Sequence, residues 1–207
     1  MLGMSPLRRC VFLSALLCLG IEHSSAVAQG IVDFRNGGLT FATDADRLVY
    51  ADFVGGTKLV GPNYAVGLWY TGGTDLALLA DLSAGRQAGL TSHFRPITTI
   101  APGVWVTPRG VRSLFALDGV PGGETAVLQV RVWDENKYAD FAQALAAGEY
   151  GASSPFLYQP PSPSCSDCPY LMENLRAFAL VPEPSAWTFG VLTACLAVWL
   201  RRRKAEL

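Results

Sequence analysis

The chain has 207 residues and a formal net charge of −1, with 16 lysines and arginines against 17 aspartates and glutamates. The excess of positive charge lies at the two ends, because residues 29–184 hold 10 basic and 15 acidic side chains. A middle region that is net acidic has no basic stripe to grip a phosphate backbone, so the composition excludes a nucleic-acid partner. Its length predicts one domain with a buried core.

The first 28 residues have the three parts of a secretory signal peptide. Arg8 and Arg9 form a basic start, an apolar run covers residues 10–21, and Ala26-Val27-Ala28 is the small-x-small pattern that signal peptidase accepts. The apolar run is shorter than the roughly 20 residues that a membrane span needs. We predict export through the Sec machinery and cleavage after Ala28. The alternative is an ordinary buried apolar helix.

The region that follows has the pattern of an all-β domain. Short apolar or alternating runs recur about every 10–15 residues between turns rich in glycine and proline. The predicted strands cover residues 31–34, 48–54, 64–70, 76–82, 103–107, 126–133, 154–158 and 175–180. This spacing predicts antiparallel strands in a β-sandwich or jelly-roll-like domain. One short helix is predicted at residues 137–147, where Tyr138, Phe141 and Leu145 recur at helical spacing before Gly148.

Four aromatic residues are candidates for stacking on sugar rings: Trp69, Tyr70, Trp105 and Trp133. Residues 64–70 are apolar on both faces, which is typical of a central strand, so Trp69 and Tyr70 are expected in the core. Trp133 shares a strand face with Gln129 and Arg131, so we expect it to be the most exposed of the four.

Catalytic chemistry finds little support in this region. His93 is the only histidine between residues 29 and 184, and no Gly-x-Ser-x-Gly nucleophile elbow surrounds it. Asp134 and Glu135 are neighbours, and neighbours on a strand point to opposite faces, so a turn before the helix suits them better. A pocket that gathers His93 with acidic residues would reopen the question. We predict a protein that is not an enzyme and has no cofactor.

Calcium is an alternative at the spaced acidic pair Asp44 and Asp46, because hard oxygen ligands on loops suit extracellular β-domains. No Asp-x-Asp-x-Asp-Gly loop accompanies the pair, and Asp44 also suits a turn. We therefore assign no metal site.

The cysteines sort with the regions of the chain. Cys10 and Cys18 lie in the signal peptide and Cys195 lies near the C-terminus, which leaves Cys165-Ser-Asp-Cys168 in the domain. A redox pair and half of a zinc ribbon are alternatives, but this motif follows a Pro/Ser-rich loop and has no second pair. In an oxidising compartment we expect a local disulfide.

The C-terminal residues have the composition of a short membrane stop. Val181-Pro182-Glu183-Pro184-Ser185 precedes an apolar run to Leu200, and Arg201, Arg202, Arg203 and Lys204 follow. The run of 16 residues would make a helix of about 24 Å, slightly shorter than the hydrocarbon core. The four cations predict a cytoplasmic C-terminus, with the domain on the other side of the membrane.

This arrangement of motif, apolar segment and basic end, in a chain with a signal peptide, resembles the PEP-CTERM sorting domain. The resemblance implies recognition and cleavage near Pro182-Glu183-Pro184 by a membrane-embedded exosortase in a Gram-negative bacterium that makes exopolysaccharide. The alternative is a plain anchor. Residues 31–36, 61–70, 130–134 and 151–156 more loosely resemble small PEP-CTERM proteins of Verrucomicrobia-type genomes, which implies β architecture and no established activity.

The sequence therefore predicts a signal peptide at 1–28, a β-rich extracytoplasmic domain at 29–180 and a sorting signal at 181–207. As a function it predicts a non-catalytic surface or extracellular-matrix protein that passes through an inner-membrane intermediate. The resemblance implies an association with exopolysaccharide or biofilm. The alternative is a secreted carbohydrate-binding module, with or without calcium.

Overall fold

The computed structural model describes residues 28–37, 42–96, 101–106, 113–162, 164–165 and 168–180. These residues form mostly strands with one α-helix, and most of the strand pairs are antiparallel, as the sequence predicted. The predicted transmembrane segment lies outside the described residues, as do residues 1–27. Among the residues that are described, no helix combines the length and apolar character needed to cross a membrane.

The largest sheet has the order β5-β4-β3-β7-β8, with β9 also paired to β7. Its strands are β3 (Tyr64–Gly72), β4 (Arg86–Phe94), β5 (Trp105–Val106), β7 (Ala126–Asp134), β8 (Gly151–Ala152) and β9 (Phe156–Tyr158). β3 and β7 pair along their whole length, from Tyr64 opposite Asp134 to Gly72 opposite Ala126. This central pair confirms the prediction that residues 64–70 form a central strand.

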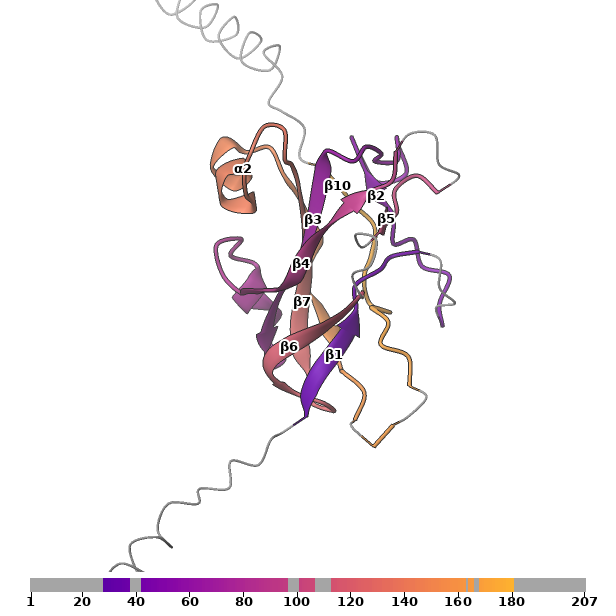
Figure 1. Ribbon diagram of the computed structural model, residues 1–207, viewed down its shortest axis with the longest axis vertical. Coiled ribbons are helices and arrows are strands. Elements are labelled where there is room, and N and C mark those ends of the chain that lie inside the picture. The colour runs from indigo at the N-terminus through magenta and orange to yellow at the C-terminus, as the bar shows by residue number, and fades with distance from the viewer. Residues whose placement is uncertain are drawn as a thin grey trace, which may run out of the picture.

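Two smaller sheets complete the strands. β1 (Gln29–Asp33) pairs antiparallel with β6 (Leu114–Pro121), and β2 (Val49–Tyr50) pairs parallel with β10 (Phe178–Ala179). β1 begins at one end of the molecule, and β2 and β10 lie together at the other end (Figure 1). The first and last described residues therefore lie at opposite ends of the domain.

One face of the large sheet carries the main core. Leu68 of β3 and Leu128, Val130 and Val132 of β7 are buried there, because every second side chain of a strand points to the same face. They pack with side chains from the small sheets and the C-terminal loop, among them Val32, Phe34, Val49, Phe115, Leu117, Met172, Leu175 and Phe178.

The opposite face of β3 and β7 is covered by α2 (Phe141–Ala147) and by the segment around η1 (Leu76–Leu79). The Asp140 side chain accepts a hydrogen bond from the Gln143 N–H at the start of α2, and Gly148 ends the helix with a φ of 78°. Trp133, Phe141 and Trp69 lie edge to face or tilted against one another in this layer.

Arg131 is buried in the same layer and has no carboxylate partner among the described residues. Its guanidinium donates to the backbone oxygens of Leu82 at 2.7 Å and Ala84 at 3.0 Å, and to Gln129 Oε1 at 2.8 Å. It also lies 4.7 Å from the centre of the Trp69 ring. Desolvation lowers the pKa of Arg131 to about 10, although the charge of Asp81 opposes this shift.

Residues 76–82, predicted to be a strand, instead form the 3-10 helix η1 and the turn after it. The Asp75 carboxylate accepts a hydrogen bond from the Ala77 N–H and so caps the first turn. Of its leucines only Leu79 is buried, whereas Leu76 and Leu78 are exposed. Within η1, this apolar run packs against the domain through Leu79 alone, so it does not have the buried face of a strand.

The sequence analysis missed β4, β6 and β8. The pairing of β4 with β3 shifts register between Val66 and Leu68, which makes room for the irregular stretch around Gly89. β6 ends in a Gly-Val-Pro segment that has the composition of a turn, yet Phe115, Leu117 and Val120 are buried. The predicted helix at residues 137–147 begins four residues later, at Phe141.

Candidate functional site

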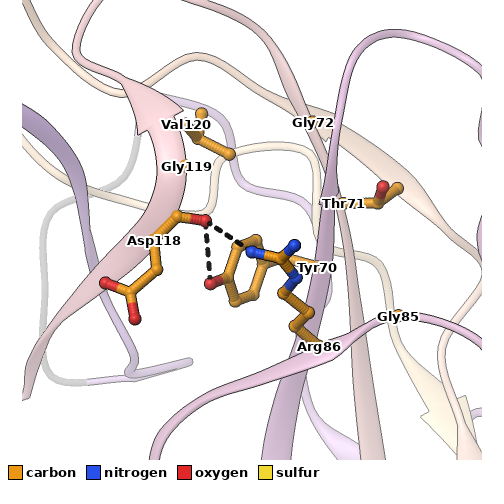
Figure 2. Close-up of a pocket in the computed structure, with 8 residues that line it drawn as sticks. All are labelled: Tyr70, Thr71, Gly72, Gly85, Arg86, Asp118, Gly119 and Val120. Carbon is orange, nitrogen blue, oxygen red and sulfur yellow. Dashed lines mark hydrogen bonds between the residues drawn. The ribbon is translucent and has the colours of Figure 1, made fainter.

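A polar cleft lies where β3 ends, β4 begins and β6 ends. Its volume is about 410 Å³, and it lies at the end of the domain where β1 starts. The residues that line it are Tyr70, Thr71, Gly72, Gly85, Arg86, Asp118, Gly119 and Val120 (Figure 2). Each comes from the end of a strand or from the turn beside it, so the sheet sets their positions.

The Asp118 carbonyl organises the cleft. The Tyr70 hydroxyl donates to it at 3.2 Å, and the Arg86 Nη1 donates to it at 3.5 Å. Figure 2 shows both bonds converging on this oxygen, while the Asp118 carboxylate points away from the arginine. The buried Tyr70 ring thus forms part of the wall, and the exposed Arg86 guanidinium lies at the mouth.

Three of the residues that line the cleft are glycines: Gly72, Gly85 and Gly119. Gly119 has a φ of 79°, which other residues rarely adopt, and a Cβ there would lie 3.7 Å from Arg86 Nη1. A side chain at this position would approach the guanidinium directly. The dipeptides Gly72-Gly73 and Asp118-Gly119 are the sequence signals, although they indicate turns and not a site.

The chemistry of the cleft favours an anionic or hydroxyl-rich ligand. Among the described residues, the Arg86 side chain makes only the long bond to Asp118, which leaves Nε and Nη2 available. These two donors match the two oxygens of a carboxylate. A second hollow of about 320 Å³, lined by Gln29, Gly119, Val120 and Pro121, shares two residues with the first. The two hollows are therefore adjacent.

His93 does meet an acidic residue, although not in this cleft. Its Nε2 lies 2.7 Å from Glu135 Oε2, and both side chains are about one third exposed. Glu135 lies in the turn between β7 and α2, as the sequence predicted for this acidic pair. Ser92 is buried on the other face of β4, away from this pair. The pair therefore has an oriented imidazole, and the adjacent Ser92 is not positioned for attack.

The four candidate aromatic residues form no exposed platform. Trp133 is only 3% exposed, so the expectation that it would be the most exposed of the four is wrong, because α2 covers the face that it shares with Arg131. Tyr70 and Trp105 are also buried. Trp69 is half-buried, with Arg131 over its ring.

Of the acidic pair Asp44 and Asp46, the second bonds to neighbouring residues along the chain. Asp46 accepts hydrogen bonds from the Leu48 N–H and from the Tyr50 hydroxyl, the second at 2.6 Å. The hydrogen bond to Asp46 raises the pKa of Tyr50. In the part of the chain that the structure describes, no three acidic, histidine or cysteine side chains gather as a metal site would require.

Cys165 and Cys168 form a disulfide, with their Cα atoms 5.7 Å apart. The two cysteines are three positions apart in the sequence. The Cys165 N–H also donates to the Ser162 carbonyl at 2.9 Å, which tightens the start of the loop.

The sorting residues Val181 to Ser185, the basic residues Arg201 to Lys204 and Ala26 lie outside the described residues. Ala28 is described, and its carbonyl accepts a hydrogen bond from the Gly122 N–H at 2.9 Å, directly before β1. Cleavage after Ala28 would leave β1 complete and remove this one bond.

In comparisons with family models, curated proteins and solved structures, nothing matches this chain. The resemblance of the C-terminal motif to a sorting signal therefore remains a prediction from the sequence.

Proposed function

We propose that this chain is a non-catalytic, exported surface or extracellular-matrix protein of a Gram-negative bacterium, sorted through its C-terminal signal. The observation that carries the proposal is the order Val181-Pro182-Glu183-Pro184-Ser185, apolar segment and basic end, which follows an N-terminal signal peptide. An exosortase cuts near the motif. The released domain then associates with exopolysaccharide or biofilm.

Two features of the domain support this proposal. Its last strand pair involves Phe178 and Ala179, and the Leu180 N–H donates to Tyr50, so strand pairing ends directly before the motif. A protease that cuts after this point leaves the described core intact. The disulfide between Cys165 and Cys168 fits an oxidising compartment.

Mass spectrometry of the protein recovered from exosortase-positive cells tests the proposal. We expect loss of residues 1–28 and of the segment after Pro184. Replacing Pro182, Glu183 and Pro184 by alanine should block processing and leave export unchanged, whereas Pro169→Ala, at an exposed proline outside the motif, should have no effect. An intact C-terminus in the unsubstituted protein would overturn the sorting assignment.

A second candidate, a carbohydrate-binding module, is favoured by the cleft beside Arg86. The available guanidinium donors suit the carboxylate of an acidic sugar, in place of the aromatic stacking that the buried tryptophans do not offer. Titration with trigalacturonate should then show binding that Arg86→Gln weakens about tenfold. Arg95→Gln, at the opposite end of β4, is the matched control. Equal binding by both variants would remove this candidate.

We also propose that the sheets pack as a β-sandwich or jelly-roll-like domain. The support is the single apolar core that joins β3 and β7 to side chains of β1, β2, β6 and β10. Hydrogen exchange in which the amides of β1, β6 and β7 open together would support one sandwich core. Independent opening of the β1–β6 pair would argue against it.

A further inference from the structure

The chain leaves the domain beside an exposed apolar loop. β2 and β10 are parallel, and the Leu180 N–H donates to the Tyr50 carbonyl at 3.0 Å. Leu180 also bridges to Gly151, so both sides of this last described residue are held. Because paired parallel strands run in the same direction, β10 leads out of the domain in the direction in which β2 enters its loop. Figure 1 shows the two strands together at this end.

The loop after β2 turns at residues 52–56 and presents two apolar side chains to solvent. Phe53 is 65% exposed and Val54 is 53% exposed, and the two are adjacent at the tip. The chain returns antiparallel, with Lys58 opposite Tyr50 and also exposed. Phe53 is the most exposed of the large apolar residues that the structure describes.

Hydrogen bonds hold the loop in this shape. Asp52 Oδ1 accepts from the Phe53 N–H at 2.7 Å and from the Thr57 N–H at 2.9 Å. The hydrogen bond from the Phe53 N–H is the main cause of the lowered pKa of Asp52. The Gly56 N–H donates to the Phe53 carbonyl, and a Cβ at Gly56 would lie 3.0 Å from the Phe53 ring. The exposed pair is therefore presented by an ordered turn.

We propose that the tip at Phe53 and Val54 contacts the lipid surface from which the C-terminal segment emerges. The inference rests on the proposed function, because it needs residues 185–200 in a membrane. Ser185 is five positions beyond Leu180, a reach of at most about 18 Å. Val54 is four positions beyond Tyr50, which is at most about 13 Å because the loop turns. The tip therefore lies within reach of the surface that Ser185 enters.

The chemistry of the tip suits the boundary between headgroups and acyl chains. A phenyl ring and an isopropyl group supply apolar contact, and the exposed Lys58 places a cation at headgroup level. Stable attachment to a membrane generally takes two signals, and here the loop would add a second contact to the anchor. The contact would hold the domain in a fixed orientation, with the cleft at the far end.

Photocrosslinking tests the contact directly. The full chain, with benzoyl-phenylalanine in place of Phe53, is reconstituted in vesicles of phosphatidylethanolamine and phosphatidylglycerol, and adducts are identified by mass spectrometry. Leu90, which is 62% exposed on β4, is the matched control position. We expect about tenfold more lipid adduct at position 53 than at position 90, as burial of one large apolar side chain would give.

The different outcomes show whether the loop contact or the membrane anchor has failed. If the chain floats with the vesicles but position 53 forms no more lipid adduct than position 90, the loop contact is overturned and the anchor stands. If the chain does not float, the anchor and the inference both fail. In membranes of cells that lack the exosortase, where the anchor is retained, protein adducts in place of lipid adducts would assign the tip to a protein partner and overturn the lipid contact.

Discussion

The two faces of β7 are both buried, but they are buried by different means. On the core face, Leu128, Val130 and Val132 pack against apolar side chains alone. On the other face, Gln129 and Arg131 are as inaccessible to solvent as those residues. Their side chains hydrogen-bond to each other, and the Arg131 guanidinium lies against two aromatic rings. The comparison shows that polar residues that alternate with apolar ones along β7 do not mark a solvent-exposed face in this protein.

The polar face joins two segments that the core face does not reach. Arg131 donates to the carbonyls of Leu82 and Ala84, so it holds the segment after η1 on the sheet. Its guanidinium also lies 5.1 Å from the centre of the Phe141 ring at the start of α2. A single cation thus connects a 3-10 segment, a strand and a helix, because its five donors point in several directions.

The largest loss of stability is expected on the core face. Leu128→Ala should lower the free energy of unfolding by about 4 kcal/mol, because the substitution leaves a cavity in a core that cannot fully collapse. Chemical denaturation monitored by tryptophan fluorescence measures the change. Leu157→Ala, at a partly exposed leucine of β9, is the control. Equal losses at the two positions would contradict the assignment of Leu128 to the core.

Removal of the buried Arg131 side chain should lower the free energy of unfolding by somewhat less than Leu128→Ala does. Arg131→Ala should lower the free energy of unfolding by about 3 kcal/mol, because the carbonyls of Leu82 and Ala84 lose a donor in a buried place. Arg131→Met restores volume but no donor. If this variant matches the unsubstituted protein, packing alone accounts for the polar face and the comparison between the faces fails.

The third prediction concerns Gly67, where the two strands and an aromatic ring approach closely. A Cβ at Gly67 would lie 2.6 Å from the Trp69 ring, so Gly67→Ala should displace the ring from Arg131. We expect a loss of about 2 kcal/mol. Combined with Arg131→Ala, the effect should be less than additive. Full additivity would show that the ring and the cation act independently.

The smallest loss of stability is expected at Asp33. Acid should weaken its ion pair with Arg35 and leave the contribution of Arg131 unchanged. Desolvation raises the pKa of Asp33, but hydrogen bonds from Arg35 and Ser113 outweigh it, and the pKa is lowered from 3.8. The folded state therefore keeps this carboxylate charged more readily than the unfolded chain does. The resulting stability is present above pH 4 and is lost as the pH falls through the lowered pKa.

Asp33→Asn should thus cost about 1 kcal/mol at pH 7, since Arg35 is partly exposed, and less than this at pH 2. The cost of Arg131→Ala should not change over the same range, because arginine stays charged in acid. Denaturant midpoints at the two pH values measure both effects. A loss in Asp33→Asn that is undiminished at pH 2 would show that the ion pair is not its cause.

Sequence reasoning succeeded where the periodicity of one strand decides the answer. Residues 64–70 and 126–133 were predicted as strands, and they form the central pair of the large sheet. It failed at residues 76–82, where an Asp75 cap favours a 3-10 turn over a strand. It also missed β4, whose Gly89 and register shift interrupt the alternation. A long regular strand has a periodic sequence pattern that can be recognised. An irregular strand such as β4 is formed by pairing with its neighbour, which the local pattern does not show.

The candidate cleft illustrates the same limit. Arg86, Asp118 and Tyr70 lie far apart in the sequence, and their spacing carries no motif. They meet because the end of β3, the start of β4 and the end of β6 lie at one end of the domain. The glycines beside them were recognised as turn residues. A turn residue indicates a site only once the positions of the surrounding strands in the fold are known.

The sequence by itself determined the mainly β character, the central strands and the chemistry of the two ends, because each depends on neighbours along the chain. Only the tertiary structure decided which faces are buried. It placed α2 over Arg131 and Trp133, which reversed the expected exposure of Trp133. It also placed Phe53 and Val54 beside the exit of the chain, through a parallel pairing of residues more than 120 positions apart. Burial and proximity arise from contacts between distant segments, which local periodicity does not encode.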